Sequence, residues 1–126
     1  MLIISQQRRR WQNLMEIEAY CFGEIKIDGK VYDHDVILAG SEVRRWVRKE
    51  SHNVLWEEVE NLLDFSPEVI IIGTGSVGVM KVSPKIIAKL RERGVEVVVE
   101  RTGRASEIFD EFSKKKKVVA ALHLTC

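Results

Sequence analysis

The feature that most constrains the fold is an alternation of apolar runs and amphipathic segments in the second half of the chain. Residues 69–72 are an uninterrupted run of Val and Ile, the pattern of a strand that is covered on both faces. Residues 95–99 and 118–124 form two further runs of this kind. A helix needs roughly 20 apolar residues to span a bilayer, so these shorter runs predict buried strands of a soluble protein.

Two helices are expected between these strands. Ser83 offers an N-cap, Pro84 suits the first helical position, and the apolar stripe that follows stops at Gly94. A second helical stripe has the spacing i, i+3, i+4, i+7 at Ala105, Ile108, Phe109 and Phe112. The sequence therefore predicts helices over 83–93 and 104–113, with Leu90 and Phe109 in the core, and a β-α-β-α-β order for this half.

The first half begins with a predicted hairpin. Residues 15–20 alternate apolar and acidic side chains as a strand does, and residues 22–27 continue with the same period. Asp28-Gly29 then supplies the two positive-φ positions of a type I′ turn, after which residues 30–32 return as the next strand.

Further short strands are expected at 36–38 and 43–48. In the second of these, alternation places one set of side chains together on a basic and aromatic face, namely Arg44, Trp46 and Arg48. Apolar residues at helical spacing over 56–63 then predict an amphipathic helix that ends before Pro67.

The first 14 residues differ in composition from the rest of the chain. They contain three arginines, no acidic residue and every glutamine of the sequence. We expect residues 1–14 to be an N-terminal extension, with Met15 as the natural start, and residues 15–126 to form a single α/β domain. The alternatives are an ordinary edge strand at 2–4 or a basic arm that binds anions or directs targeting.

Charge and cysteine content bound the function. The chain has 126 residues, with 20 Lys and Arg against 19 Asp and Glu, so no overall field attracts it to nucleic acid or to an anionic membrane, and any such contact must be local. We therefore expect neither as a partner. Cys21 and Cys126 form no metal or disulfide pattern, and a cytoplasmic location is the default expectation. The many charged and few amide side chains after residue 14 are typical of a thermophile.

The loop at 73–78 fits the pattern G-x-G-x-x-G and follows a predicted strand, with Glu100 where a ribose-binding acid would lie. In a dinucleotide-binding fold the helix begins at the glycines, so that its first amides face the pyrophosphate. Here the helix signal begins only at Ser83-Pro84. We therefore expect a turn that needs positive φ, and no bound cofactor.

Several stretches together resemble one small protein family. In the second half these are the strand and glycine loop at 68–75, Met80-Lys81-Val82, Gly94-Val95-Glu96-Val97, Arg101-Thr102 and Leu122-His123-Leu124-Thr125-Cys126. In the first half they are Phe22-Gly23, Ile27-Asp28-Gly29 and Trp46-Val47-Arg48 with His52. The family includes an adipogenesis-associated domain-containing protein and a mitochondrial complex I assembly factor, and the resemblance covers roughly residues 20–126.

The resemblance implies a three-layer α/β fold with a central mixed sheet and a smaller β-layer from the first half. It also implies that Gly73-Thr74-Gly75 is a feature of the family, and it implies no proven catalysis. The role in complex I assembly does not transfer directly to a chain of thermophilic composition.

Other groups offer incomplete chemistry. His123 and Cys126 have H-x-x-C spacing, but two residues on one extended segment do not complete a tetrahedral zinc site, and no metal is expected. Cys126 as a nucleophile activated by His123 is also disfavoured. Asp33, His34 and Asp35 are interpreted as a polar turn rather than a cation site.

The predicted ligand-binding residues come from three places: Gly73, Thr74 and Gly75, then Arg101 and Thr102, then Trp46 and Arg48. If the strands at 69–72 and 95–99 are parallel neighbours, the loops that follow them meet at one edge of the sheet, where α/β proteins commonly bind ligands. The alternatives are that Arg101 pairs with Glu100 or Glu107 and that Thr102 caps a helix.

Two classes of function follow. The first, which we favour, is a non-catalytic binding or assembly module with a protein partner, since no complete catalytic set is present. The second is a protein that binds a small molecule or anion at the glycine loop, with enzymatic activity as an extension of that role. Oligomeric state is not specified by the sequence.

Overall fold

A computed structural model of the chain describes residues 15–50 and 52–126. The predicted N-terminal extension at 1–14 lies outside the described residues. Among the described residues, no helix is long and apolar enough to cross a membrane.

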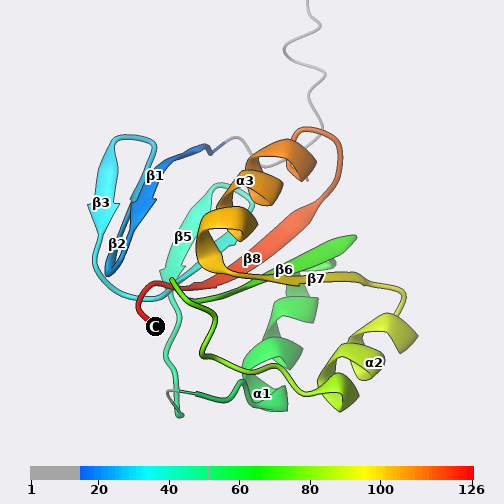
Figure 1. The fold of residues 1–126 in the computed structure, drawn as a ribbon. Helices are drawn as coiled ribbons and strands as arrows, with labels where there is room; N and C mark the ends of the chain where they lie inside the picture. The colour runs from blue at the N-terminus through cyan, green and yellow to red at the C-terminus, as the bar shows by residue number, and fades with distance from the viewer. Residues whose placement is uncertain (1–14, 51) are drawn as a thin grey trace, which may run out of the picture.

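A five-stranded mixed sheet forms the centre of the fold (Figure 1). The strand order is β5-β4-β8-β6-β7, in which β6 runs parallel to β7 and β8, and β4 runs antiparallel to β5 and β8. Its strands are β4 (Val36–Ala39), β5 (Glu42–Arg45), β6 (Val69–Thr74), β7 (Glu96–Glu100) and β8 (Val118–His123). Since β6 and β8 have neighbours on both sides and helices or strands on both faces, their runs are apolar throughout.

A smaller antiparallel sheet consists of β1 (Ile17–Cys21), β2 (Glu24–Ile27) and β3 (Lys30–Tyr32). The turn between β2 and β3 has φ of 48° at Asp28 and 82° at Gly29, which confirms the predicted type of turn. The strands at 22–27 and 30–32 are likewise confirmed, although β2 begins at Glu24 because Phe22 and Gly23 form a turn after β1.

The helical elements are α1 (Trp56–Glu60), the 3-10 helix η2 (Asn61–Phe65), α2 (Pro84–Glu92) and α3 (Thr102–Phe112). Ser83 caps α2 by accepting a hydrogen bond from Lys85 N at 3.1 Å, as its sequence predicts. The third helix starts two residues before its predicted start, with Arg101 rather than Thr102 as the N-cap. The helix predicted over 56–63 is present, but it tightens to 3-10 geometry at Asn61 and ends at Ser66, where φ is 52°.

Alternation along β6 divides the core into two layers. Val69 and Ile71 face a cluster shared with the small sheet and Phe109 of α3, whereas Ile70 and Ile72 face a cluster shared with α1, η2 and Leu90 of α2. Figure 1 shows α3 on one side of the central sheet and α1 and α2 on the other. The fold is therefore α/β with two sheets and three layers, and Leu90 and Phe109 are fully buried as predicted.

Candidate functional site

The ends of β6, β7 and β8 bring two predicted loops together. We call this region the carboxyl edge; it comprises residues 73–79, Arg101, Thr102 and residues 123–126. Gly75 N donates to Thr102 Oγ1 at 2.9 Å, and Thr102 N donates to Gly75 O at 3.0 Å. The prediction that the loops after β6 and β7 meet is therefore confirmed.

The hydroxyl groups at this edge are used within the fold. Thr102 is fully buried, and its Oγ1 donates to His123 O at 2.5 Å while accepting from Gly75 N. Thr74 Oγ1 donates to Glu100 O at 3.2 Å. A Cβ on Gly73 would lie 2.8 Å from Thr102 Oγ1 and 2.9 Å from a methyl of Leu122, so this glycine is required by close packing.

The glycine loop holds residues 125 and 126 of its own chain. Ser76 N donates to Thr125 O at 2.6 Å, and Val79 N donates to Cys126 O at 2.9 Å. A Cβ on Gly75, whose φ is 104°, would approach the Cys126 carbonyl to 2.5 Å. The helix that follows begins only at Pro84, as predicted. These amides therefore lie in a loop, where they donate hydrogen bonds to residues 125 and 126, and not at the start of a helix.

Arg101 occupies a different position from the other loop residues. Its side chain passes over Gly78, where an added Cβ would lie 3.3 Å from Arg101 Cγ and 3.4 Å from Nε. Among the described residues it forms no ion pair within 4 Å, and Glu107 instead pairs with Arg104 at 3.1 Å. The alternative in which Arg101 pairs with Glu100 or Glu107 is therefore not the arrangement in this structure.

The prediction of an exposed basic and aromatic face at residues 43–48 is wrong. Strand β5 ends at Arg45, and Trp46 is 4% exposed in the core layer beneath α1. The indole is too large and apolar to remain on an edge strand when a helical layer can cover it, so the chain turns inward after Arg45. Arg48 stacks on the Trp46 ring at 4.8 Å from its centre. Neither side chain presents the stacking surface that the alternation predicted.

Arg48 lies between the buried carboxylate of Glu58 and the part-buried carboxylate of Asp35. Its Nη1 is 3.7 Å from Asp35 Oδ2, and its Nε is 3.4 Å from Glu58 Oε1, an ion pair whose geometry does not make a hydrogen bond. The side chains of Arg48, Glu58 and Asp35 are 9%, 4% and 14% exposed. Arg48 Nη2 also donates to Asn53 O at 3.1 Å. We call Asp35, Arg48, Glu58 and His123 the buried ionic cluster.

The cluster continues to the carboxyl edge through Asp35. This carboxylate accepts from Leu124 N at 2.9 Å and lies 2.7 Å from His123 Nδ1, and His123 Nε2 lies 3.3 Å from Thr125 Oγ1. The arrangement orients the imidazole, with one ring nitrogen at the Asp35 carboxylate and the other facing the Thr125 hydroxyl. Sequence analysis treated Asp35 as part of a turn, because nothing in the local pattern links it to a histidine 88 positions away.

Burial also shifts the pKa of one side chain beside the carboxyl edge, that of Tyr20. Tyr20 OH donates to Leu124 O at 2.8 Å, and burial raises the pKa of the Tyr20 phenol above its ordinary value, while its hydrogen bond with Ser76 acts in the opposite direction. The phenol therefore stays protonated and acts as a fixed donor to the segment that the glycine loop holds. Within the described part of the chain, no group of three or more His, Cys, Asp and Glu side chains is arranged to hold a metal ion.

An open groove of about 660 Å³ lies between strand β5 and the helical segment α1–η2. Its apolar lining includes Trp46, Leu62 and Phe65. Charges of both signs surround these residues: Arg44, Arg45 and Lys49 come from the strand and the segment after it, and Glu57 and Asp64 from the helical side. Val47, 71% exposed, also lines the groove.

Solved structures of similar fold span the same elements. A conserved hypothetical protein of Pyrococcus horikoshii is 30% identical, with a TM-score of 0.81 over 88% of this chain and 99% of that protein. A Bartonella henselae protein named as an outer membrane protein is 20% identical, with a TM-score of 0.76 over 91% and 98%. A Bordetella pertussis protein described as an Mth938-like domain is 19% identical, with a TM-score of 0.64 over 94% and 89%. The last two show likeness of fold alone.

Residues 17–123 match a family model described as a protein of unknown function (DUF498/DUF598). The match runs from the start of β1 to the end of β8 and so includes both sheets and His123 of the buried ionic cluster. This chain therefore belongs to the DUF498/DUF598 family.

Proposed function

We propose that the chain is a non-catalytic binding module that takes up an extended segment of a partner protein in the groove beside β5. The observation that carries the proposal is the combination of a free strand edge and an adjacent groove. Among the described residues, β5 is the outer strand of the central sheet and pairs only with β4. An exposed edge of this kind accepts a further strand through backbone hydrogen bonds, and a groove beside it supplies specificity.

The register identifies which backbone groups are available. Trp46 N donates to Asp35 O, so antiparallel alternation turns the amide and carbonyl groups of Val43 and Arg45 outward. No hydrogen bond among the described residues uses these outward groups. The groove offers an apolar floor and both signs of charge, which suits a peptide of mixed composition better than a small uniform ligand.

The carboxyl edge supports a structural role for the groups that could otherwise be catalytic. The Thr102 hydroxyl and the Gly75 and Ser76 amides already have partners within the fold, and Asp35 and Arg48 neutralise each other in part. A binding role needs none of these groups to be free. The resemblance to an assembly factor motivates the further proposal that the partner belongs to a larger complex, in the cytoplasm of a thermophilic cell.

Photo-crosslinking from the groove tests the proposal. We would place p-benzoylphenylalanine at Val47 and compare Arg45→Pro with Arg45→Ala in the native host. Proline removes the outward N–H and is tolerated on an edge strand, whereas alanine keeps the N–H. We expect one crosslinked protein with the parent and Arg45→Ala and its loss with Arg45→Pro at matched folded fraction. An unchanged product in Arg45→Pro, or no product from Val47, would contradict β5 as the binding edge.

A second candidate function is the binding of a small anion at Arg101. Two observations favour it. Arg101 has no ion pair among the described residues, and its side chain passes over Gly78, whose amide, like that of the preceding Val77, forms no hydrogen bond among these residues. Loop amides and a guanidinium together are suited to phosphate or carboxylate oxygens. Of the residues predicted for this site, Arg101 is thus the one whose side chain is available, while Thr74 and Thr102 support the loop.

Amide NMR with inorganic phosphate tests this second candidate. We expect saturable shifts at Val77 and Gly78 that disappear in Arg101→Ala and persist in Arg104→Ala, a matched control that removes a nearby exposed arginine. Thr74→Val should keep the binding, because its hydroxyl is bonded to Glu100 O. Shifts that survive Arg101→Ala would place the anion elsewhere.

A further inference from the structure

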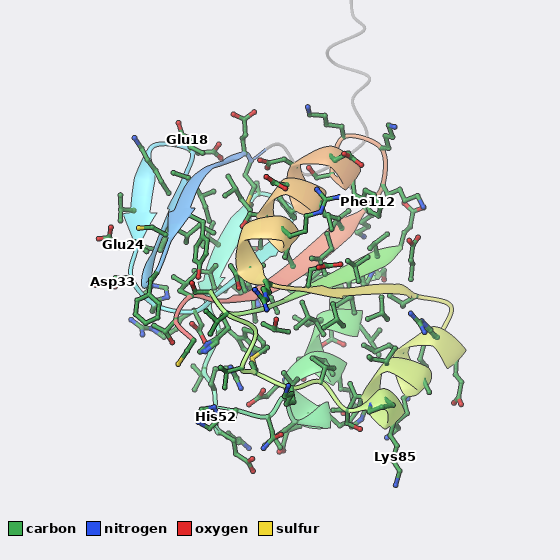
Figure 2. The ribbon with its side chains drawn as sticks, in the orientation of Figure 1. Glu18, Glu24, Asp33, His52, Lys85 and Phe112 are labelled. Carbon is green, nitrogen blue, oxygen red and sulfur yellow. The ribbon has the colours of Figure 1, made fainter. Side chains whose placement is uncertain are left out.

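Three cations form a line along one side of α2. Lys85, Lys89 and Arg93 are four residues apart, which places successive positions about 6 Å apart along the helix axis. All three are exposed, and Figure 2 shows the Lys85 side chain extending from α2 away from the body of the protein. We call these residues the basic stripe.

Two cations of the stripe share one aromatic ring. Lys89 Nζ lies 4.2 Å from the centre of the Trp56 ring, and the Arg93 guanidinium carbon lies 5.7 Å from it. Each cation is attracted to the half-buried indole, which holds its head group near α1. The two positive charges also repel each other, and an anion placed between them would relieve that repulsion.

Some exposed cations of this fold have acidic partners, whereas the cations of the stripe have none among the described residues. Exposed pairs within 4 Å include Arg44–Glu42, Lys49–Glu57, Arg104–Glu107 and Lys116–Glu96. In the described ranges, no stripe residue takes part in such a pair. The acids of the two helices are Glu92 on α2 and Glu57, Glu58 and Glu60 on α1, and none of them pairs with a stripe cation within 4 Å. The positive charge here is therefore local, in a chain of almost balanced composition.

We infer that the basic stripe docks an acidic helical segment of a partner protein. A helix with carboxylates at i, i+4 and i+8 repeats its negative charges with the same spacing of about 6 Å, so the two lines of charge are commensurate. The stripe is a different surface from the β5 groove, whose lining includes none of its residues. The inference therefore goes beyond the proposed function and does not depend on it.

Other anionic polymers fit the stripe less well. Duplex DNA is bound through many phosphate contacts from Lys and Arg, whereas the stripe offers three cations in a chain of almost balanced charge. Single strands bind through bases stacked on open aromatic faces, but Lys89 already covers the Trp56 ring. A membrane-surface helix inserts an apolar face, whereas Ile86 and Leu90 of α2 are buried in the core.

Fluorescence anisotropy with a labelled peptide tests the inference on the full chain. The probe is an alanine-rich helical peptide with Glu at i, i+4 and i+8, and the comparison peptide carries Gln at those positions. We expect saturable binding of the Glu peptide alone, weakened by added salt. The variant Lys85→Gln/Lys89→Gln/Arg93→Gln should bind about tenfold more weakly or worse, since three ion pairs are lost.

A matched variant removes the same charge elsewhere. Lys26→Gln/Lys30→Gln/Lys115→Gln changes three exposed lysines outside the stripe and should bind the peptide within about twofold of the parent. Equal weakening of binding in both triple variants would contradict the stripe as the binding surface, because net charge alone would then explain the binding. Tighter, stripe-dependent binding of a dT oligonucleotide or of anionic vesicles than of the Glu peptide would overturn the acidic helix as partner. Arg45→Pro should leave peptide binding unchanged, which separates this result from a failure of the β5 proposal.

Discussion

Arg48 and the basic stripe carry the same kind of charge in opposite surroundings. Arg48 is enclosed between Asp35 and Glu58 and packs on Trp46. Lys85, Lys89 and Arg93 are exposed, and in the described part of the chain they form no ion pair within 4 Å. Both regions also use an indole: Trp46 is buried with its arginine, and Trp56 holds two cations at the surface. The comparison separates charge that stabilises the fold from charge that is available to a partner.

The largest expected effect is the loss of the enclosed arginine. Arg48→Met should lower the free energy of unfolding by about 3–5 kcal/mol, because it leaves the Asp35 and Glu58 carboxylates buried without their cation. Urea unfolding of Lys89→Met provides the matched comparison, and a change within about 0.5 kcal/mol is expected at that exposed site. Similar losses in the two variants would show that the buried ionic cluster does not support the fold more than surface charge does.

Truncation of one apolar side chain on each face of the central sheet gives losses of unfolding free energy with which the loss in Arg48→Met can be compared. Phe109→Ala and Leu90→Ala should each cost about 2–5 kcal/mol, since both side chains are fully buried and a cavity would remain. Thermal and urea unfolding would give the two values. An unchanged melting temperature in either variant would reject the corresponding core layer as a contributor to stability.

The sequence predicted the elements better than it predicted the site. Local signals placed the Asp28-Gly29 turn, the Ser83 cap and the apolar run of β6, because turns, caps and buried strands depend on residues close together in the chain. The meeting of the loops after β6 and β7 was predicted on the condition that these strands are parallel neighbours, and the structure shows that they are.

The site depended on partners that local pattern does not contain. Strand alternation predicted that Trp46 and Arg48 lie at the surface. Tertiary packing instead buries the indole, and it places the Arg48 guanidinium beside two carboxylates, Asp35 just before β4 and Glu58 in α1. Asp35 reaches His123 only because β4 and β8 are paired in the sheet. A buried polar group must find a partner, and which partner it finds is decided by topology.

A smaller effect is expected at the hydroxyl that joins the two loops. Thr102→Val should cost about 1–3 kcal/mol, since His123 O and Gly75 N would lose their partner in a buried place. Thr102→Ser keeps the hydroxyl and is expected to lose clearly less stability in the same urea experiment. If Val and Ser variants were equally stable, the hydroxyl would contribute nothing to the carboxyl edge and would be free to serve a ligand.

The smallest effect concerns Asp110, a partly buried carboxylate that, unlike Asp35, has a backbone amide rather than a guanidinium close by. It accepts a hydrogen bond from Ile17 N at 3.0 Å. Burial raises the pKa of the Asp110 carboxyl above its ordinary value of 3.8, with Glu16 acting in the same direction, while the Ile17 amide and Lys114 oppose the shift.

A raised pKa in the folded state means that the native protein holds this proton more tightly than the unfolded chain does. The resulting stability is fully present below pH 3.8 and is lost as the pH rises through the folded pKa. Asp110→Asn keeps an oxygen for Ile17 N and cannot ionise, so its stability relative to the parent should increase over this interval and then level off. Urea midpoints of both proteins between acid and neutral pH would measure the difference. A difference that stays constant or decreases with pH would contradict a raised pKa of Asp110 in the fold.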